Sequence, residues 1–245
     1  MSDDALWDPQ WWLAPRAASL ERKAAAARSL STIAKPGDSF LIVVEGKVTE
    51  VVYLELLRHH LQLAAAFIKI TPGDAPDPKA VIQTAARHAR EQIRKHRKQQ
   101  SSFSEPTRFD HVWAVIDADV PARENNWHQL VALARKENVR LVPSMPSFEF
   151  WLLLHFGFNT RGDLPDGASA KAAVKKITGM DSDNHASAQQ HMPSLLQHWQ
   201  QAAQHAEAVR QHHLAAGSPT PANPSTEVDI LARAMNAAAP AHLQG

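Results

Sequence analysis

Short apolar, β-prone runs alternate with longer amphipathic stretches in the first half of the chain. The run at 40–44, FLIVV, is apolar throughout, which favours a strand buried on both faces of a parallel sheet. Further strands are expected over 66–71, 111–116 and 139–142. Helices are expected between them, with Thr49 as the N-cap of the first, over 50–63, 79–98 and 125–137. The alternation predicts an α/β protein with a mostly parallel sheet flanked by helices.

The second half of the chain changes character. After an apolar helical block, FEFWLLLHF, it is rich in Ala and Gln, and three helical stretches are expected over 169–178, 188–215 and 225–238. These stretches indicate a helical C-terminal appendage packed on the α/β core. We therefore predict three parts, which are a segment rich in Trp, Ala and Arg, an α/β core and a helical C-terminal region, over 1–35, 36–156 and 157–245.

Composition excludes some chemistry but identifies none. The 245 residues are 44% hydrophobic, which is enough for a substantial core, and the net charge of +1 is uninformative about nucleic acid. The chain contains no cysteine, so disulfides, Fe–S clusters and thiol nucleophiles are excluded. It shows neither a secretory signal nor an apolar stretch long enough to span a bilayer. We therefore expect a cytoplasmic protein that has no membrane partner.

Acidic residues follow two of the expected strands. Glu45 comes directly after the first strand, and Asp117 and Asp119 come after the third. Ligands of open parallel sheets bind beyond the carboxyl ends of the strands, so these acids are expected to meet in one crevice. Converging carboxylates repel one another, and a hard divalent cation such as Mg²⁺ relieves the repulsion. The alternative for either motif alone is an acid that caps the next turn or helix.

Four sequence blocks carry a resemblance to a known family: LIVVEGKVTE, VWAVIDADV, SMPSFEFWLLLHF and NPSTEVDIL. In this order they resemble the RloB-like proteins, a Toprim-fold group linked to restriction–modification and phage-defence loci, often beside an ATPase. The block SFEFWLLLHF is the most specific of the four. The resemblance implies that the core at 36–156 is Toprim-like.

The resemblance also implies roles for individual acids. Glu45 matches the Toprim glutamate, which is read as a general base or a metal ligand, and Asp117 and Asp119 match the D-x-D metal ligands. Glu50 matches the second acid of EG-x-x-TE, which helps to hold metal in related nucleases. Glu149 matches the acid of the FE-x-W block, and its alternative role is that of an acid favoured by a helix N-terminus.

The chain departs from the family pattern at two positions. Lys47 and Val120 stand where the family often has an acid, which weakens the case for two tightly held metals. Lys47 is therefore a candidate phosphate contact in the catalytic site, and its alternative is a solvated lysine at the start of a helix.

A basic stripe is expected on the helix at 79–98. Four arginines at three- and four-residue spacing share one face, where a nucleic-acid backbone could lie: Arg87, Arg90, Arg94 and Arg97. The alternative is a solvated face of an amphipathic helix.

The leading hypothesis is a nuclease, or nuclease subunit, of a bacterial antiviral defence system. It would use Mg²⁺, with Mn²⁺ as a substitute, to cleave phosphodiester bonds in DNA or RNA. The alternative is a non-catalytic Toprim-fold regulatory partner of a defence ATPase, and a second copy of the chain is a further candidate partner. A topoisomerase-like activity is less favoured, because Tyr53 is the chain's one tyrosine and is expected in mid-helix. The chain lacks a Walker-type phosphate loop, so it should not hydrolyse ATP itself.

Overall fold

The computed structural model describes residues 34, 37–65, 67–98, 106–158 and 164–240. The predicted N-terminal segment at 1–35 lies outside these residues except for Ala34, which is buried in the core. Within the described part of the chain, no helix combines the length and the apolar character needed to cross a membrane.

A five-stranded sheet forms the centre of the molecule, in the order β2-β1-β3-β4-β5. The first four strands are parallel, and the short β5 pairs antiparallel with β4. Their bounds are Phe40–Val44 for β1, Ile68–Pro72 for β2, His111–Asp117 for β3, Arg140–Met145 for β4 and Ser225–Thr226 for β5. The predicted α/β class with a mostly parallel sheet is confirmed.

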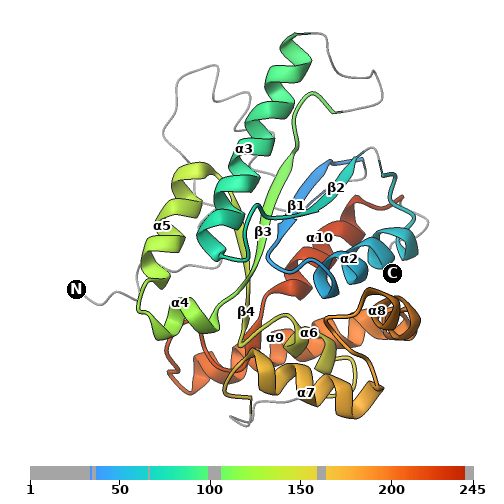
Figure 1. The fold of residues 1–245 in the computed structure, drawn as a ribbon, viewed down its shortest axis with the longest axis vertical. Helices are drawn as coiled ribbons and strands as arrows, with labels where there is room; N and C mark the ends of the chain where they lie inside the picture. Colours follow the sequence, from blue (N-terminus) through green and yellow to red (C-terminus); the bar gives the residue numbers. More distant parts are fainter. Residues whose placement is uncertain (1–33, 35–36, 66, 99–105, 159–163, 241–245) are drawn as a thin grey trace.

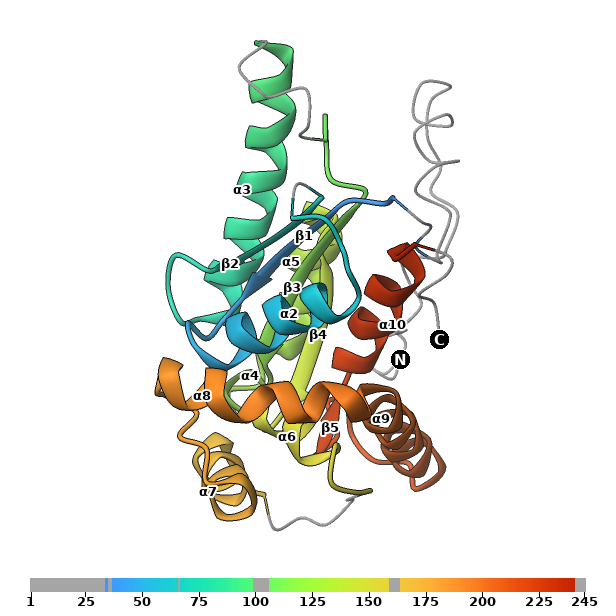
Figure 2. The same cartoon turned by 90° about the vertical axis from the view of Figure 1, so that its right-hand side faces the viewer.

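The helices cover the two faces of the sheet (Figures 1 and 2). Helices α3 (Pro78–Arg97) and α5 (Trp127–Glu137) cover one face. Helix α2 (Thr49–His60) and helix α10 (Val228–Ala238) cover the other face. The remaining elements are α4 (Asp119–Arg123), α6 (Glu149–Leu153), α7 (Gly167–Thr178), α8 (His185–His191), the 3₁₀-helix η3 (Met192–His198) and α9 (Trp199–Ala215).

Alternation along the strands builds a separate core on each face. In β1 every residue is buried, with Phe40, Ile42 and Val44 on the α2 face and Leu41 and Val43 on the α3 face. Successive side chains of a strand point to opposite faces, so an unbroken apolar run is what a strand covered on both sides requires. The first run of the sequence therefore forms the central part of a doubly covered sheet.

The helices that follow β1 and β3 leave the sheet on opposite sides. The chain passes from β1 into α2 on one face, and from β3 through α4 into α5 on the other. The two strands are neighbours, so their carboxyl ends flank a topological switch point, where an open α/β sheet has room for a ligand. In Figure 1 this edge lies toward the bottom, near α4, α6 and α7.

Some predicted boundaries were wrong. Thr49 is not the N-cap of α2: it is the first helical residue, and its hydroxyl donates to the carbonyl oxygen of Ser182 at 2.7 Å. The predicted helix at 188–215 is α8, η3 and α9 in series, with Pro193 in the first turn of η3. Residues 125–137 begin with a turn before α5, and 225–238 begin with β5.

The helical C-terminal region shares its core with the α/β part. Buried residues of β1 and α2 belong to the same apolar cluster as buried residues of α6, α9 and α10. Strand β5 joins the sheet from this region, and α10 packs against β4. The division at residue 156 stays a prediction, and the shared core shows that the two parts pack closely.

Candidate active site

The central prediction was that Glu45, Asp117 and Asp119 meet in one crevice, and the structure joins the first two of them. Glu45 follows β1, and Asp117 is the last residue of β3, the neighbouring parallel strand. The backbone N–H of Asp117 donates to Glu45 Oε2 at 3.0 Å. The carboxylate of Asp117 in turn accepts from the backbone N–H of Phe148 at 2.9 Å. Both carboxylates are therefore held at the switch point between β1 and β3.

Glu50 reaches the same place from the first turn of α2. Its side chain folds back so that Oε1 accepts from the backbone N–H of Gly46 at 2.8 Å. The carboxylate lies so close to Gly46 that a Cβ added there would overlap Glu50 Oε2. Glycine at position 46 therefore makes room for the buried Glu50 side chain.

Glu149, the first residue of α6, is the fourth acid of this edge. It accepts from the hydroxyl of Ser147 at 2.6 Å, and both residues are buried. The chain at 147–149 contributes to the site twice, because the next backbone N–H, that of Phe148, holds Asp117. We call Glu45, Glu50, Asp117 and Glu149 the acidic cluster.

Burial and mutual repulsion disfavour the ionised carboxylates of the acidic cluster and raise the pKa values of three of its members, Glu45, Glu50 and Asp117. Burial raises the pKa of Glu45 to about 7; the Asp117 N–H opposes this, and the charges of Glu50, Asp77 and Asp119 add to it. Burial also raises the pKa of Glu50 to about 7, with a further contribution from Glu149.

Asp117 responds in the same way. Burial, followed by the charges of Glu50, Glu45 and Glu149, raises its pKa well above its ordinary value. A cation would offset the repulsion that these acids share.

Asp119 and Lys47 lie at the rim of the cluster. Asp119 begins α4, and its carboxylate accepts from the backbone N–H of Val120 at 2.7 Å. It acts on Glu45 more weakly than Glu50 does. Lys47 is exposed in the turn between β1 and α2. The charges of Glu50, Glu45 and Glu149 act on Asp117, whereas sequence reasoning had grouped Asp117 with Glu45 and Asp119 as metal ligands.

A complete metal-ligand set is not preformed. Among the described residues, no group of three or more His, Asp or Glu side chains is arranged to hold a metal ion. The chemistry of the donors nevertheless fits Mg²⁺, which commonly takes one or two carboxylates and fills its other positions with water and phosphate oxygens. Glu45 and Asp117 are one such pair. Mg²⁺ therefore stays a prediction that the donor set supports.

The basic stripe on α3 runs away from the acidic cluster. The helix begins near the carboxyl edge, where Asp77 caps it, and extends past the opposite edge of the sheet (Figure 1). At 1.5 Å per residue, Arg94 and Arg97 lie about 24 and 28 Å along the helix from its start. The nucleic-acid contacts predicted for these arginines stay a prediction, but α3 does not bring its last turns to the cluster.

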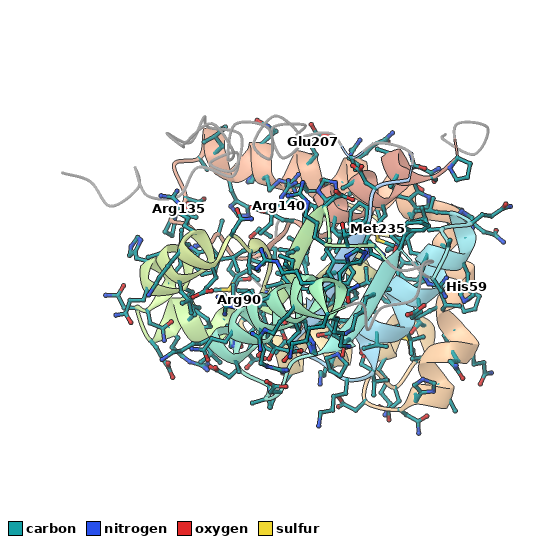
Figure 3. The ribbon with its side chains drawn as sticks, turned by 90° about the horizontal axis from the view of Figure 1, so that it is seen from above. His59, Arg90, Arg135, Arg140, Glu207 and Met235 are labelled. Carbon is teal, nitrogen blue, oxygen red and sulfur yellow. The ribbon has the colours of Figure 1, made fainter. Side chains whose placement is uncertain are left out.

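Two arginines of the stripe have acidic partners. Arg87 binds Asp74 at 2.8 Å, and Arg90 binds Glu137 of α5 at 2.6 Å. Figure 3 shows Arg90 on the side of the molecule opposite Glu207 of α9, with the sheet between them.

Three residues near the acids were missed as site residues by sequence reasoning. Gly46 and Ser147 lie inside the blocks that carry the family resemblance, so the resemblance could have identified them as site residues. Lys171 of α7 lies in no such block. Its charge acts on Glu50, and the charges of Glu149 and Glu50 act on it.

Tyr53 is fully buried, and its hydroxyl lies 3.0 Å from His155 Nε2. It is therefore not placed to attack a nucleic-acid backbone, which agrees with the low rank given to a topoisomerase-like activity. His155, Trp113, Phe150 and Trp151 are also buried in the core.

Comparison with known proteins adds one finding. No curated protein and no solved structure matched the chain. Residues 40–235 match the family described as RloB-like protein, a range that begins at β1, ends in α10 and contains all the acids described above. Because the match covers most of the chain, the protein belongs to the RloB-like family.

Proposed function

We propose that the protein is a divalent-cation-dependent nuclease, acting alone or as a nuclease subunit in bacterial antiviral defence. The observation that carries the proposal is the meeting of Glu45 and Asp117, joined by a 3.0 Å hydrogen bond at the switch point of the sheet. Membership of the RloB-like family agrees with the proposal without specifying an activity.

We assign each acid a role according to its position in the site. Asp117 and Glu45 are the candidate ligands, and Glu50 and Glu149, whose charges act on Asp117, are candidates for orienting bound water. A bound Mg²⁺ or Mn²⁺ would offset the repulsion in the cluster, help to ionise a water molecule and neutralise charge on the scissile phosphate. The alternative role of Glu45 is that of a general base: burial raises its pKa to about 7, which suits the transfer of a proton from the attacking water when the carboxylate does not itself bind the cation.

The substrate is a phosphodiester backbone of DNA or RNA. Lys47, exposed next to Gly46, stays a candidate phosphate contact at the rim. The arginines of α3 are candidates for contacts farther along a strand, beyond the reach of the acidic cluster. A Toprim type of fold, a cytoplasmic location and an ATPase partner remain parts of the same proposal.

Cleavage assays with isosteric variants test the proposal. Glu45→Gln and Asp117→Asn should each lower the cleavage rate in Mg²⁺ or Mn²⁺ by about 100-fold or more, as expected for loss of an acid–base or metal-binding group. Neither variant should lower the melting temperature, because the amide oxygen of each new side chain can still accept the backbone N–H that the carboxylate accepts and the change removes a repelling charge. Glu207→Gln, an exposed change on α9, is the matched control. Variants that cut DNA and RNA as fast as wild type would refute the site.

A second candidate function is that of a non-catalytic partner of a defence ATPase. The exposed Lys47 and Val120, at the acidic edge where the family often has acids, favour it. Size-exclusion chromatography with a neighbouring ATPase, together with the cleavage assay, separates the two. A stable complex without metal-dependent cleavage supports the second candidate, and cleavage by the isolated chain excludes it.

A further inference from the structure

Helix α7, from the C-terminal region, lies beside the acidic cluster. It packs against α6, the helix that carries Glu149. At its start, a Cβ added to Gly167 would lie 3.4 Å from the Cβ of Ser147, whose hydroxyl binds Glu149. The first turns of α7 therefore approach the chain segment that holds both Glu149 and Asp117.

Lys171 projects from this part of α7 toward a turn that is fixed beside Glu50. Its Nζ donates to Asp183 Oδ1 at 2.6 Å. The neighbouring Ser182 accepts from the hydroxyl of Thr49 at 2.7 Å, and Thr49 precedes Glu50 in α2. Two separate contacts, one through α6 and one through α2, thus bring Lys171 near the acids.

The charge of Lys171 is felt inside the cluster. Burial alone would lower its pKa, but the hydrogen bond to Asp183 and the charges of Glu149, Asp183 and Glu50 raise it above its usual value. The amine is therefore a stable cation at neutral pH, next to the place where a phosphodiester would bring further negative charge.

The partner of Lys171 is easily replaced. The Asp183 side chain is 76% exposed, and that of Lys171 is 43% exposed. Ion pairs this open to water contribute little to stability and weaken in salt. A phosphate oxygen offers the same kind of acceptor to the ammonium group, which binds phosphate as a compact point charge.

We propose that Lys171 leaves Asp183 and binds a nonbridging oxygen of the scissile phosphodiester, and that Asp183 competes with the nucleic-acid strand for the amine. This inference rests on the proposed nuclease function and adds a substrate-contacting residue from the C-terminal region. It also predicts that the bound nucleic-acid strand passes alongside α7.

Strand binding tests the proposal without relying on turnover. Fluorescence anisotropy would follow labelled single-stranded DNA and RNA of equal sequence, with Ca²⁺ in place of Mg²⁺ to suppress cleavage. Lys171→Met should weaken binding of the cleaved strand type by about 10-fold. The slope of log affinity against log salt concentration should decrease by the amount expected for about one phosphate contact. Asp183→Asn should tighten binding several-fold, because the competing carboxylate is gone. Lys171→Arg should retain part of the affinity.

The matched control lies one helical turn away. Lys175 is on the same helix and has its own acidic neighbour, Asp181, at 3.8 Å. Lys175→Met removes the same charge from α7, but it should leave affinity and cleavage within about twofold of wild type. Equal losses in the Lys171 and Lys175 variants would show a diffuse charge effect and overturn the proposal.

Three other results are decisive. If Lys171→Met lowers the melting temperature while strand binding stays at the wild-type level, the lysine is a structural counter-ion and the proposal is wrong. If wild type binds and cleaves while both Lys171→Met and Asp183→Asn behave like it, this inference fails and the proposed function stands. A wild-type protein that neither binds nor cleaves either strand contradicts both.

Discussion

Gly46 and Glu50 compete for one small space at the end of β1. The Glu50 carboxylate lies where a side chain at position 46 would have to start, and it accepts the Gly46 N–H. Any larger residue at 46 must therefore push a buried acid out of the cluster. The glycine that follows Glu45 is therefore required by the side chain of Glu50.

Gly46→Ala should therefore impair catalysis more than folding. Moving the Glu50 carboxylate by about 1 Å is enough to lower the cleavage rate by up to about 100-fold. Gly167→Ala is the matched control, because its new Cβ would make only ordinary contact with Ser147. Cleavage rates and melting temperatures of the two variants would be compared, and a Gly46→Ala protein that cleaves at the wild-type rate would contradict this account.

Among individual site residues, those that directly follow a strand could be predicted from the sequence. Glu45 and Asp117 could be paired from sequence because the carboxyl ends of parallel strands share an edge, and the structure brings them together. Glu50 and Glu149 came from the family resemblance. Lys171 could not be found, because its approach to the cluster depends on how α7 packs against α6.

The helices on the α2 face are joined by a buried polar contact. The Nδ1 of His155 lies 3.1 Å from the carbonyl oxygen of Trp151, so this nitrogen carries the proton and Nε2 accepts from the hydroxyl of Tyr53. Burial lowers the pKa of His155 from 6.5 to about 4. The neutral imidazole thus links α2 to the segment that follows α6.

This link should make part of the stability dependent on pH. The folded protein binds fewer protons at His155 than the unfolded chain, so this stability is present above about pH 6.5 and is lost as pH falls toward 4. Between pH 7.5 and 5 the loss should be about 2 kcal/mol. Urea unfolding of wild type and His155→Gln at both values measures it. A difference between the two proteins that does not change with pH would contradict the prediction.

An ion pair at the other end of the C-terminal region joins α9 to α10. Arg210 of α9 binds both carboxylate oxygens of Asp229 of α10, at 2.5 and 2.7 Å, and Asp229 is only 1% exposed. This explains the second acid of the NPSTEVDIL block as a structural residue.

Asp229→Asn should lower the free energy of unfolding by about 2–3 kcal/mol, because it leaves the largely buried Arg210 charge without its partner. The control is Glu207→Gln, which breaks the exposed Glu207–Arg233 pair and should cost less than about 1 kcal/mol. Chemical denaturation of both variants decides the matter, and equal effects would be evidence against a structural role for the buried pair.

At the scale of elements, long periodic segments were easier to predict than short or interrupted ones. β1 and α3 lie within one residue of their expected bounds, since their apolar patterns are unbroken. β5 was missed, because two residues carry no periodicity and its pairing with β4 is a long-range contact. The break of 188–215 at η3 was also missed, although Pro193 was a local signal.

The whole molecule brings four acids together from four elements, β3, α2, α6 and the end of β1. Their repulsion is a cost that the folded state carries and the unfolded chain does not. A cation bound at the cluster should therefore stabilise the entire fold, by about 2.7 kcal/mol at an ion concentration 100 times its Kd.

Thermal unfolding checks this stabilisation directly. Saturating Mn²⁺ or Mg²⁺ should raise the melting temperature of wild type by several degrees, as expected for about 2–3 kcal/mol in a chain of this size. Asp117→Asn should remove most of the shift, whereas Glu207→Gln should keep it. A shift that persists in Asp117→Asn would mean that the ion binds elsewhere.

The most direct test of the central claim is the location of a bound cation. Crystals of the wild-type protein soaked in Mn²⁺ would be measured at a wavelength where manganese scatters anomalously. We expect an anomalous peak in the acidic cluster, within coordination distance of carboxylate oxygens of Glu45 and Asp117. Crystals saturated with Mn²⁺ that show no peak there, or a peak bound only by other residues, would contradict the account.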